Sequence, residues 1–254
     1  MNNKKKIDTR SLVGASLLTA ISIVLTRVFS FMIPLAGLPT LRFGIGEVPL
    51  IISGILFGPL VGGLSGVIAD LIGVMINLQG SAFFPGFTLS SILWGVIPGV
   101  LFSLIRKNKF KINYNIINGV VLTSIAVGIV LVLFDSKVLA MKNGTYYMYD
   151  KPMPMIYAML YVLLVASFIA IPIIMSRKEN SKGEIISIDK IAFIVTVPYI
   201  IISLGLNTLW LSMLYEKGFL ILLPGRILAG LIVIPLHTTI IYTISKAFKH
   251  VKVS

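Results

Sequence analysis

Long uncharged apolar stretches, separated by short polar segments, make up most of the chain. About 20 apolar residues are needed to cross the hydrocarbon core of a bilayer, and six stretches approach or exceed that length: 48–69, 71–105, 117–134, 153–176, 191–215 and 227–245. Pro59 and Gly62-Gly63 divide the first of them, and Phe83–Gly86 break the second, which is too long for one helix. The pattern therefore predicts eight helices, at about 11–33, 43–58, 61–78, 87–106, 113–134, 154–176, 190–215 and 222–247.

Composition supports an all-α membrane protein, a polytopic helical bundle that forms a single integral membrane domain over residues 1–254. Of the 254 residues, 57% are hydrophobic and only 12% are charged, which leaves too few polar residues to cover a globule of this size. The net charge of +13 is concentrated, because 15 of the 22 Lys and Arg residues lie in four blocks: Lys4–Arg10, Arg106–Lys111, Arg177–Lys190 and Lys246–Lys252. Basic loops of membrane proteins stay in the cytoplasm. We therefore expect an even number of spans in the cell membrane, cytoplasmic termini, and contacts with anionic lipid rather than nucleic acid.

Motifs for catalysis are missing from the sequence. There is no Cys, which excludes disulfides, thiolate metal sites and thiol catalysis. The zinc motif His-Glu-x-x-His, the nucleophile elbow Gly-x-Ser-x-Gly and the phosphate loop of ATPases are absent too. We expect a protein that is not an enzyme and has no metal or cofactor. If it drives uphill transport, another chain must use the ATP.

Ionisable residues inside the predicted spans are costly in lipid and therefore informative. Arg27 and Asn207 are each 16 residues beyond the cytoplasmic start of a helix, so both should lie about 24 Å from that side. Arg226 begins the last helix near the outer face, and Trp210 shares a helical face with Asn207. Matching depth favours a pocket in the outer third of the bundle. Snorkelling of the two arginines to the outer interface remains the alternative.

Two acidic residues in the spans have less specific interpretations. Glu47 is expected to neutralise Arg27 or Arg42 in a structural ion pair. Asp70 lies deeper and follows a row of glycines at four-residue spacing (Gly54, Gly58, Gly62 and Gly66), which favours close helix packing. A packing hydrogen bond and a proton relay are both open for Asp70.

The stretch FFPGFTLSSILWG (83–95) concentrates aromatic residues around a Pro-Gly break. Phe84 and Phe87 flank the break, where they would cover or stack on a flat ligand. Gly86 would let that ligand approach the backbone, and Thr88 lies in the first turn of the next helix, where hydroxyl and free N–H groups meet polar atoms. Aromatic walls and Arg rims suit a flat, anionic ligand.

Four segments resemble the folate-specific members (FolT family) of the substrate-binding S components of energy-coupling-factor (ECF) vitamin transporters. They are the end of the first helix at 24–27, LRFGIGEVPLIISGILFGPLVGGLSGVIADLIG (41–73), FFPGFTLSSILWGVIPG (83–99) and LNTLWLSMLYEKGFLILLPGRILAGLIVIPLH (206–237). The resemblance implies a six-helix core that captures folate from outside with high affinity. It also implies association with a membrane coupling subunit and two cytosolic ATPases, which use the ATP.

Site residues follow from the resemblance together with the pocket argument. The substrate-binding candidates are Arg27, Phe84, Gly86, Phe87, Thr88, Asn207, Trp210, Tyr215 and Arg226. In the family, an Ala-x3-Ala motif on the first helix docks the coupling subunit. The nearest matches are Ala15-x3-Thr19 and Ser16-x3-Ala20, which we expect to dock that partner or to pack inside the bundle.

The chain departs from the family pattern at residues 112–188, which are expected to add a helical pair to a core formed by 1–111 and 189–247. The resemblance implies no function for this pair. Two other functions stay open. One is an S component for another vitamin or a pterin-like heterocycle. The other, of a different class, is a membrane-embedded enzyme that acts on lipid with Asp70 and His237 as acid and base, which requires both side chains in one cavity.

Overall fold

A computed structural model describes residues 8–35, 38–78, 83–107, 114–135, 139–142, 145–148, 151–152, 155, 159, 162, 166, 170, 187–216 and 218–247. The elements in chain order are α1 (Thr9–Arg27), β1 (Phe31–Leu35), β2 (Leu38–Phe43), α2 (Glu47–Phe57), α3 (Pro59–Ile76), α4 (Pro85–Lys107), α5 (Tyr114–Asp135), β3 (Leu139–Lys142), β4 (Thr145–Met148), β5 (Lys151–Pro152), α7 (Ile188–Pro198), the π-helix η1 (Tyr199–Leu206), α8 (Asn207–Tyr215) and α9 (Phe219–Ala247).

The predicted helical membrane bundle is confirmed. Within the described residues, five helical segments are long and apolar enough to cross a membrane: Thr9–Arg27, Pro59–Ile76, Pro85–Lys107, Ile188–Tyr215 and Gly225–Lys246. The predicted helix at 154–176 lies almost entirely outside the described residues, so the count of eight remains a prediction. The domain layout, with an inserted pair at 112–188, also remains a prediction.

The first two predicted helices are shorter than expected because a β-hairpin lies between them. The apolar run that was assigned to one helix at 11–33 turns into strand β1, which pairs antiparallel with β2, with a register shift between Ile33 and Pro34. Helix α2 consequently begins at Glu47 rather than at 43 and has 11 residues, which gives it a length of only about 16 Å. That is roughly half the thickness of the hydrocarbon core.

The polar segment that follows α5 contains three short strands. Strands β3 and β4 pair antiparallel from Leu139↔Met148 to Lys142↔Thr145, and β5 adds to β4. The two residues between the paired positions Lys142 and Thr145 are Asn-Gly in the sequence. This dipeptide is the strongest short-range signal for a hairpin that a sequence contains.

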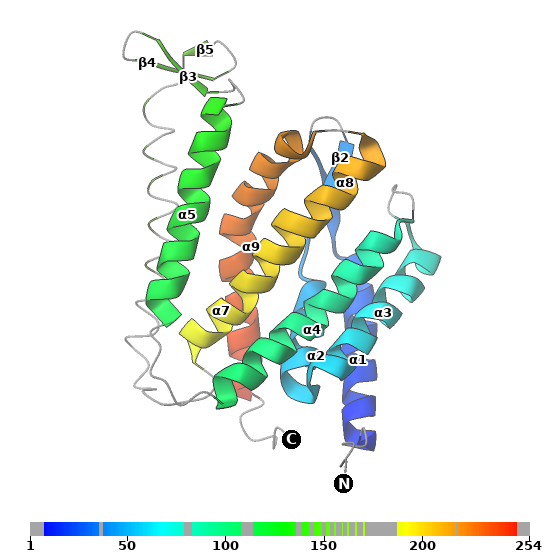
Figure 1. The fold of residues 1–254 in the computed structure, drawn as a ribbon. Coiled ribbons are helices and arrows are strands. Elements are labelled where there is room, and N and C mark those ends of the chain that lie inside the picture. The colour runs from blue at the N-terminus through cyan, green and yellow to red at the C-terminus, as the bar shows by residue number, and fades with distance from the viewer. Residues whose placement is uncertain are drawn as a thin grey trace.

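The described helices run in both directions along the bundle, and their basic ends lie at one end of it (Figure 1). Arg10 lies at the start of α1, Arg106 and Lys107 at the end of α4, Lys190 at the start of α7 and Lys246 at the end of α9. The β1–β2 hairpin and the α8–α9 turn lie at the opposite end (Figure 1). This segregation of charge agrees with the predicted topology.

Glycines bring α2, α3 and α4 into backbone contact, as their spacing predicted. A Cβ added to Gly54 would lie 2.1 Å from the carbonyl oxygen of Gly95, and one added to Gly95 would lie 2.0 Å from that of Gly62. A Cβ on Gly66 would lie 2.1 Å from the carbonyl oxygen of Ser91. Only residues without a side chain allow such close approach of helices.

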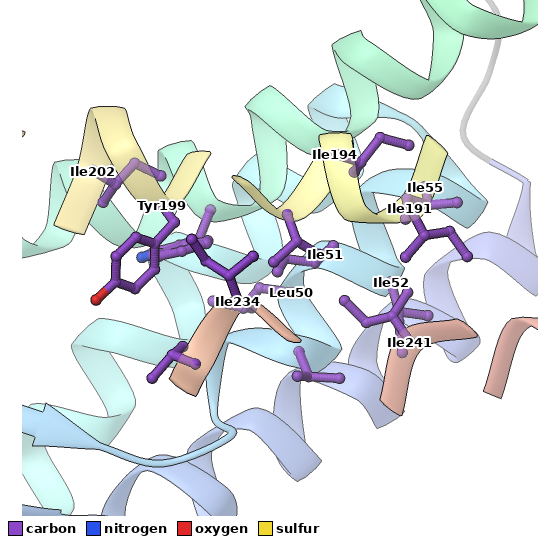
Figure 2. Packing of buried hydrophobic residues seen from close by; sticks show 14 of the residues in the cluster. Leu50, Ile51, Ile52, Ile55, Ile191, Ile194, Tyr199, Ile202, Ile234 and Ile241 are labelled. Carbon is purple, nitrogen blue, oxygen red and sulfur yellow. The ribbon is translucent and has the colours of Figure 1, made fainter. Parts of the chain in front are cut away.

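The apolar core is formed where α2, α7 with η1, and α9 converge (Figure 2). Ile51 from α2, Ile194 and Val195 from α7, Ile202 from η1 and Ile241 from α9 are almost completely buried. β-branched side chains dominate this cluster, and they interlock with little freedom of rotation. The core therefore fixes the α7–η1–α8 segment against the glycine-packed α2–α3–α4 unit, and the candidate site lies at one end of this junction.

Candidate functional site

A cavity of about 140 Å³ lies at the end of the bundle that carries the β1–β2 hairpin. It is lined by the C-terminal ends of α1 and α3, the N-terminal ends of α2 and α4, strand β2, η1, α8 and the first half of α9. Its polar and charged lining residues are Ser22, Thr26, Arg27, Arg42, Glu47, Asp70, Ser90, Ser91, Tyr199, Ser203, Asn207, Arg226 and His237. Its aromatic lining residues besides Tyr199 are Phe83, Phe84, Phe87 and Trp94.

Five of the nine predicted substrate-binding residues line this one cavity, although they come from four helices and one turn: Arg27, Phe84, Phe87, Asn207 and Arg226. The structure therefore groups around one cavity residues that were expected to lie at similar depth in the bundle. The other four, Gly86, Thr88, Trp210 and Tyr215, do not line the cavity. Tyr215 ends α8 and is half-buried.

Arg27 is buried rather than extended to the membrane surface, with 7% of its area exposed. Its Nη1 donates a 2.8 Å hydrogen bond to the carbonyl oxygen of Asn77, the residue that caps α3, and its Nη2 lies 3.6 Å from Oδ1 of Asp70. Gly73 makes room for the guanidinium, because a Cβ there would lie 2.6 Å from Nε. Arg27 thus joins the end of α1 to α3. Its ion pair is with Asp70. Of the two partners predicted for Glu47, Arg27 or Arg42, it is Arg42 on which the charge of Glu47 acts.

Asp70 also connects α3 to α4. The Thr88 hydroxyl donates a 2.7 Å hydrogen bond to Oδ2 of Asp70. Asp70 therefore has the packing function that was one of its two interpretations, and Thr88 is its partner in the first turn of α4. Because this carboxylate already accepts from Thr88 and pairs with Arg27, much of its hydrogen-bonding capacity is used within the protein.

The Pro-Gly turn is packed by aromatic rings. The ring centroids of Phe84 and Trp210 are 5.8 Å apart, and those of Phe84 and Phe87 are 6.0 Å apart in an edge-on arrangement. The Trp210 indole N–H donates a 3.2 Å hydrogen bond to the Ser90 hydroxyl, which joins α8 to α4. A Cβ on Gly86 would lie 2.6 Å from both the Phe84 and the Trp210 rings. The space beside Gly86 is thus filled by protein rings, contrary to the prediction that it admits a ligand.

Arg226 is held by the π-helix. Its Nη1 donates a 3.0 Å hydrogen bond to the carbonyl oxygen of Ser203, and the Tyr199 hydroxyl donates a 2.8 Å bond to the carbonyl oxygen of Arg226. A π-helix leaves carbonyl groups out of the regular ladder and often occurs at functional sites. Here it provides an acceptor that fixes a guanidinium, 5% exposed, at the cavity wall. Snorkelling is therefore wrong for Arg226, as it is for Arg27.

Several polar atoms at the cavity have no partner among the residues that the structure describes. Nε of Arg42, Oδ1 of Asn207 and Nδ1 of His237 are buried without a hydrogen bond. His237 Nε2 lies 3.1 Å from the carbonyl oxygen of Gly44. Because a carbonyl only accepts, Nε2 carries the proton and Nδ1 of the neutral ring is an acceptor. Burial lowers the pKa of Arg42 from its usual value, and the nearby carboxylates of Glu47 and Asp70 oppose that shift.

Sequence reasoning did not assign three charged residues and one histidine of the cavity wall to the site: Arg42, Glu47, Asp70 and His237. Arg42, Glu47 and Asp70 were interpreted as ion-pair or packing residues, and His237 as a group of the lipid-enzyme alternative. The signal that could have found Arg42 and Glu47 is their place on either side of the Gly44–Gly46 turn, which leads directly from the hairpin into α2. Asp70 and His237 do share this cavity, which was the condition for the lipid-enzyme alternative.

The first helix presents two different faces to its surroundings. Ala15 and Thr19 are buried, with 7% and 5% of their areas exposed, and the Thr19 hydroxyl bonds to the carbonyl oxygen of Ala15. They pack inside the bundle, so the prediction that they dock a partner is wrong for this conformation. Ser16 and Ala20 are exposed, and their docking role remains a prediction.

Comparisons with known proteins agree on one family. The family model described as "ECF transporter, substrate-specific component" matches residues 10–176. The curated protein Folate transporter FolT of Clostridium novyi (strain NT) is 36% identical over 131 residues, which are 52% of this chain. The match spans 65% of that relative's length, just under two thirds. A solved structure titled "Crystal structure of FolT bound with folic acid" superposes with a TM-score of 0.52 at 16% identity, covering 92% of this chain and 93% of that chain. At this identity the superposition concerns the fold.

Proposed function

The chain belongs to the substrate-specific components of ECF transporters, and we propose that it binds folate in the cavity described above. The observation that carries the proposal is the combination of three guanidinium groups, Arg27, Arg42 and Arg226, with a cluster of aromatic rings in one cavity. Folate has a flat heterocycle, a benzene ring and two carboxylates. Arginine binds carboxylates through paired hydrogen bonds, and aromatic side chains stack on flat rings.

The relatives support folate over other vitamins. A protein named as a folate transporter shares about a third of its residues with this chain over the matched region, and the structure with folic acid has the same fold. Arg27, Phe84, Phe87 and Arg226, which belong to segments that carry the resemblance, line the same cavity.

Binding by the purified protein tests this function. In detergent, titration calorimetry should give tight binding of folate and no measurable binding of riboflavin, thiamine or biotin. Quenching of Trp94, which lines the cavity, provides a second readout. Tight binding of riboflavin beside micromolar or weaker binding of folate would overturn the assignment. Mass spectrometry of ligand that copurifies would identify another pterin-like heterocycle, the alternative within the same family.

We further propose that the protein lies in the cell membrane with both termini in the cytoplasm, and that it delivers its ligand with a coupling subunit and two ATPases. The family supports this partnership, and the basic residues at the ends of α1, α4, α7 and α9 support the orientation. Cells that express the chain should take up labelled folate only when the coupling subunit and ATPases are expressed with it. Uptake without them would contradict the proposal.

The lipid-enzyme alternative meets its geometric condition but has little chemical support. Asp70 pairs with Arg27 and accepts from Thr88, and His237 is fixed to a backbone carbonyl. A general acid or base must be free to exchange protons with a substrate, and the Asp70 carboxylate is instead held by Arg27 and Thr88. Transport therefore remains the function that the geometry supports best.

A further inference from the structure

Glu47 is an acidic residue of the cavity whose carboxylate makes no direct hydrogen bond or ion pair with the described residues, although its charge acts on the nearby Arg42 guanidinium. It is the first residue of α2, is half-buried and lines the cavity. Throughout the part of the chain that the structure describes, no side chain or backbone group forms a hydrogen bond or an ion pair with this carboxylate. The N-terminus of α2 stabilises its negative charge. A charged acceptor at a cavity wall is therefore available to a ligand.

Asp70, the other carboxylate of the cavity, differs from Glu47 in its contacts with the protein. Both carboxylates line the same cavity. Asp70 accepts from Thr88 and pairs with Arg27, so it serves to hold three helices together. Glu47 has no comparable structural contact, and its expected ion pair with Arg42 is not formed in the structure as a direct contact. A costly charge at this depth that does not hold helices together is typical of a functional site.

Two further acceptors of the cavity wall point to the same kind of ligand group. The buried Oδ1 of Asn207 has no donor among the described residues. Nδ1 of His237 is a buried acceptor in the tautomer that donates to Gly44. With Glu47, three acceptors that line the same cavity can receive N–H donors from a ligand. Burying them beside a ligand without such donors would leave them unsatisfied, which is costly.

The ligand group that fits is a flat ring with adjacent N–H donors. An amino-pyrimidinone, the head of a pterin, carries a ring N–H next to an exocyclic amino group. These two parallel donors match the two oxygens of one carboxylate, in the way that a guanidinium does. Phe84, Phe87 and Trp94 supply flat apolar surface to the same cavity. The three guanidinium groups of the same cavity suit the two carboxylates of a folate.

We propose that Glu47 is a specificity-determining residue, whose carboxylate accepts from the paired N–H donors of the ligand's amino-pyrimidinone head. The proposal rests on the proposed function, since it assigns one part of folate to one residue of the cavity. It predicts that affinity depends on the 2-amino group of the heterocycle, and that this dependence requires the charge of Glu47.

A chemical and mutational cycle tests the proposal. The two ligands are folate and its analogue in which a methyl group replaces the 2-amino group. The two proteins are the wild type and Glu47→Gln, whose amide presents only one acceptor and an N–H that opposes the ligand's donors. Glu216→Gln is the matched control, since Glu216 is exposed and does not line the cavity. Affinities are measured by calorimetry, and thermal melting without ligand checks the fold of each variant.

The wild type and Glu216→Gln should bind folate at least roughly 10-fold more tightly than the 2-methyl analogue, the scale of a hydrogen bond to a charged group. In Glu47→Gln this preference should fall to about twofold or less, because folate loses the contacts of both donors with the carboxylate, whereas the analogue, which keeps only the ring N–H, loses one. If the variant melts early, Glu47→Asp, which withdraws the carboxylate by one methylene, should show the same reduced preference.

Three results would contradict the assignment of Glu47. They are equal affinities of the wild type for both ligands, an unchanged preference in Glu47→Gln, and an equal loss of affinity for both ligands in that variant. The last result would mean that Glu47 only balances the charge of Arg42. Failure of the wild type to bind either compound would instead overturn the proposed function, so the two failures are distinguishable.

Discussion

Replacement of Gly95 by Ala tests the idea that glycine contacts hold the site-bearing helices together. An added Cβ would lie 2.0 Å from the carbonyl oxygen of Gly62 and 2.2 Å from its carbonyl carbon. Normal contacts of a Cβ begin above 3.0 Å, so α4 would have to move away from α3 by about 1 Å. The atom in the way belongs to a helix backbone, which cannot rotate aside as a side chain can.

The expected loss of stability follows from two opposing terms. Overpacking of a core typically costs about 1–3 kcal/mol, and a clash with backbone belongs at the upper end. Movement away from α3 is also constrained on the other side, since the carbonyl oxygen of Gly95 itself lies against Gly54 of α2. The higher helix propensity of Ala offsets about 1 kcal/mol. The net loss should be about 2 kcal/mol, or roughly 4–8 °C in melting temperature for a chain of this size.

The assay is thermal unfolding in detergent, followed by the fluorescence of Trp94 and Trp210. Gly128→Ala in α5 is the matched control, because a Cβ there has no atom within 4 Å. It should melt at the same temperature as the wild type or slightly above it. Gly95→Ala should also bind folate more weakly, since α3 and α4 carry Asp70 and Phe87 into the cavity wall. If Gly95→Ala melts together with Gly128→Ala, the close α3–α4 packing is not a determinant of stability.

Three further substitutions follow from the contacts at the cavity. Asp70→Asn should lower stability by about 3 kcal/mol, because it breaks a buried ion pair with Arg27; a melting temperature equal to that of the wild type would contradict this. Trp210→Phe keeps a ring beside Phe84 but removes the hydrogen bond to Ser90. A loss of about 1 kcal/mol in the free energy of unfolding is therefore expected. A much larger loss would show that the shape of the indole ring matters more than its hydrogen bond. Asn207→Ala should weaken folate binding by at least about 1 kcal/mol in calorimetry. The melting temperature of the free protein should not change. An unaltered affinity for folate would show that Asn207 is not part of the site.

The helices could be predicted from the sequence because few backbone conformations satisfy their hydrogen bonds in lipid. A polar backbone inside a bilayer must satisfy its own hydrogen bonds, so the long apolar runs in the part of the chain that the structure describes form helices. The β1–β2 hairpin was missed because Phe31–Leu35 continues the apolar run of α1, and short apolar runs fit helix and strand alike. Pro34 and Pro39 were the available signals, since each interrupts a regular helix.

The sequence predicts how deep the site residues lie in the bundle, but not which way their side chains point. Counting residues from the cytoplasmic side placed Arg27 and Asn207 at one height, and both line the cavity. The same counting placed Trp210 at that height, yet its ring packs on Phe84 and Gly86 rather than on the cavity. The rotation of each helix decides this difference. It depends on tertiary contacts such as the hydrogen bond from Trp210 to Ser90, which no spacing along one helix reveals.

The polar residues around the cavity divide into two classes by what their atoms contact. Arg27 and Asp70 hold helices to one another, so their removal should lower stability first and affinity as a consequence. Glu47 and Asn207 present acceptors for which the described residues supply no donor, so their removal should lower affinity while the melting temperature of the free protein stays the same or rises. Measuring both quantities for each variant therefore separates residues that build the cavity from residues that recognise its ligand. The FFPGFTLSSILWG stretch belongs to both classes, because Phe84 packs against Trp210 and also lines the cavity, so Phe84→Ala should lower both quantities together.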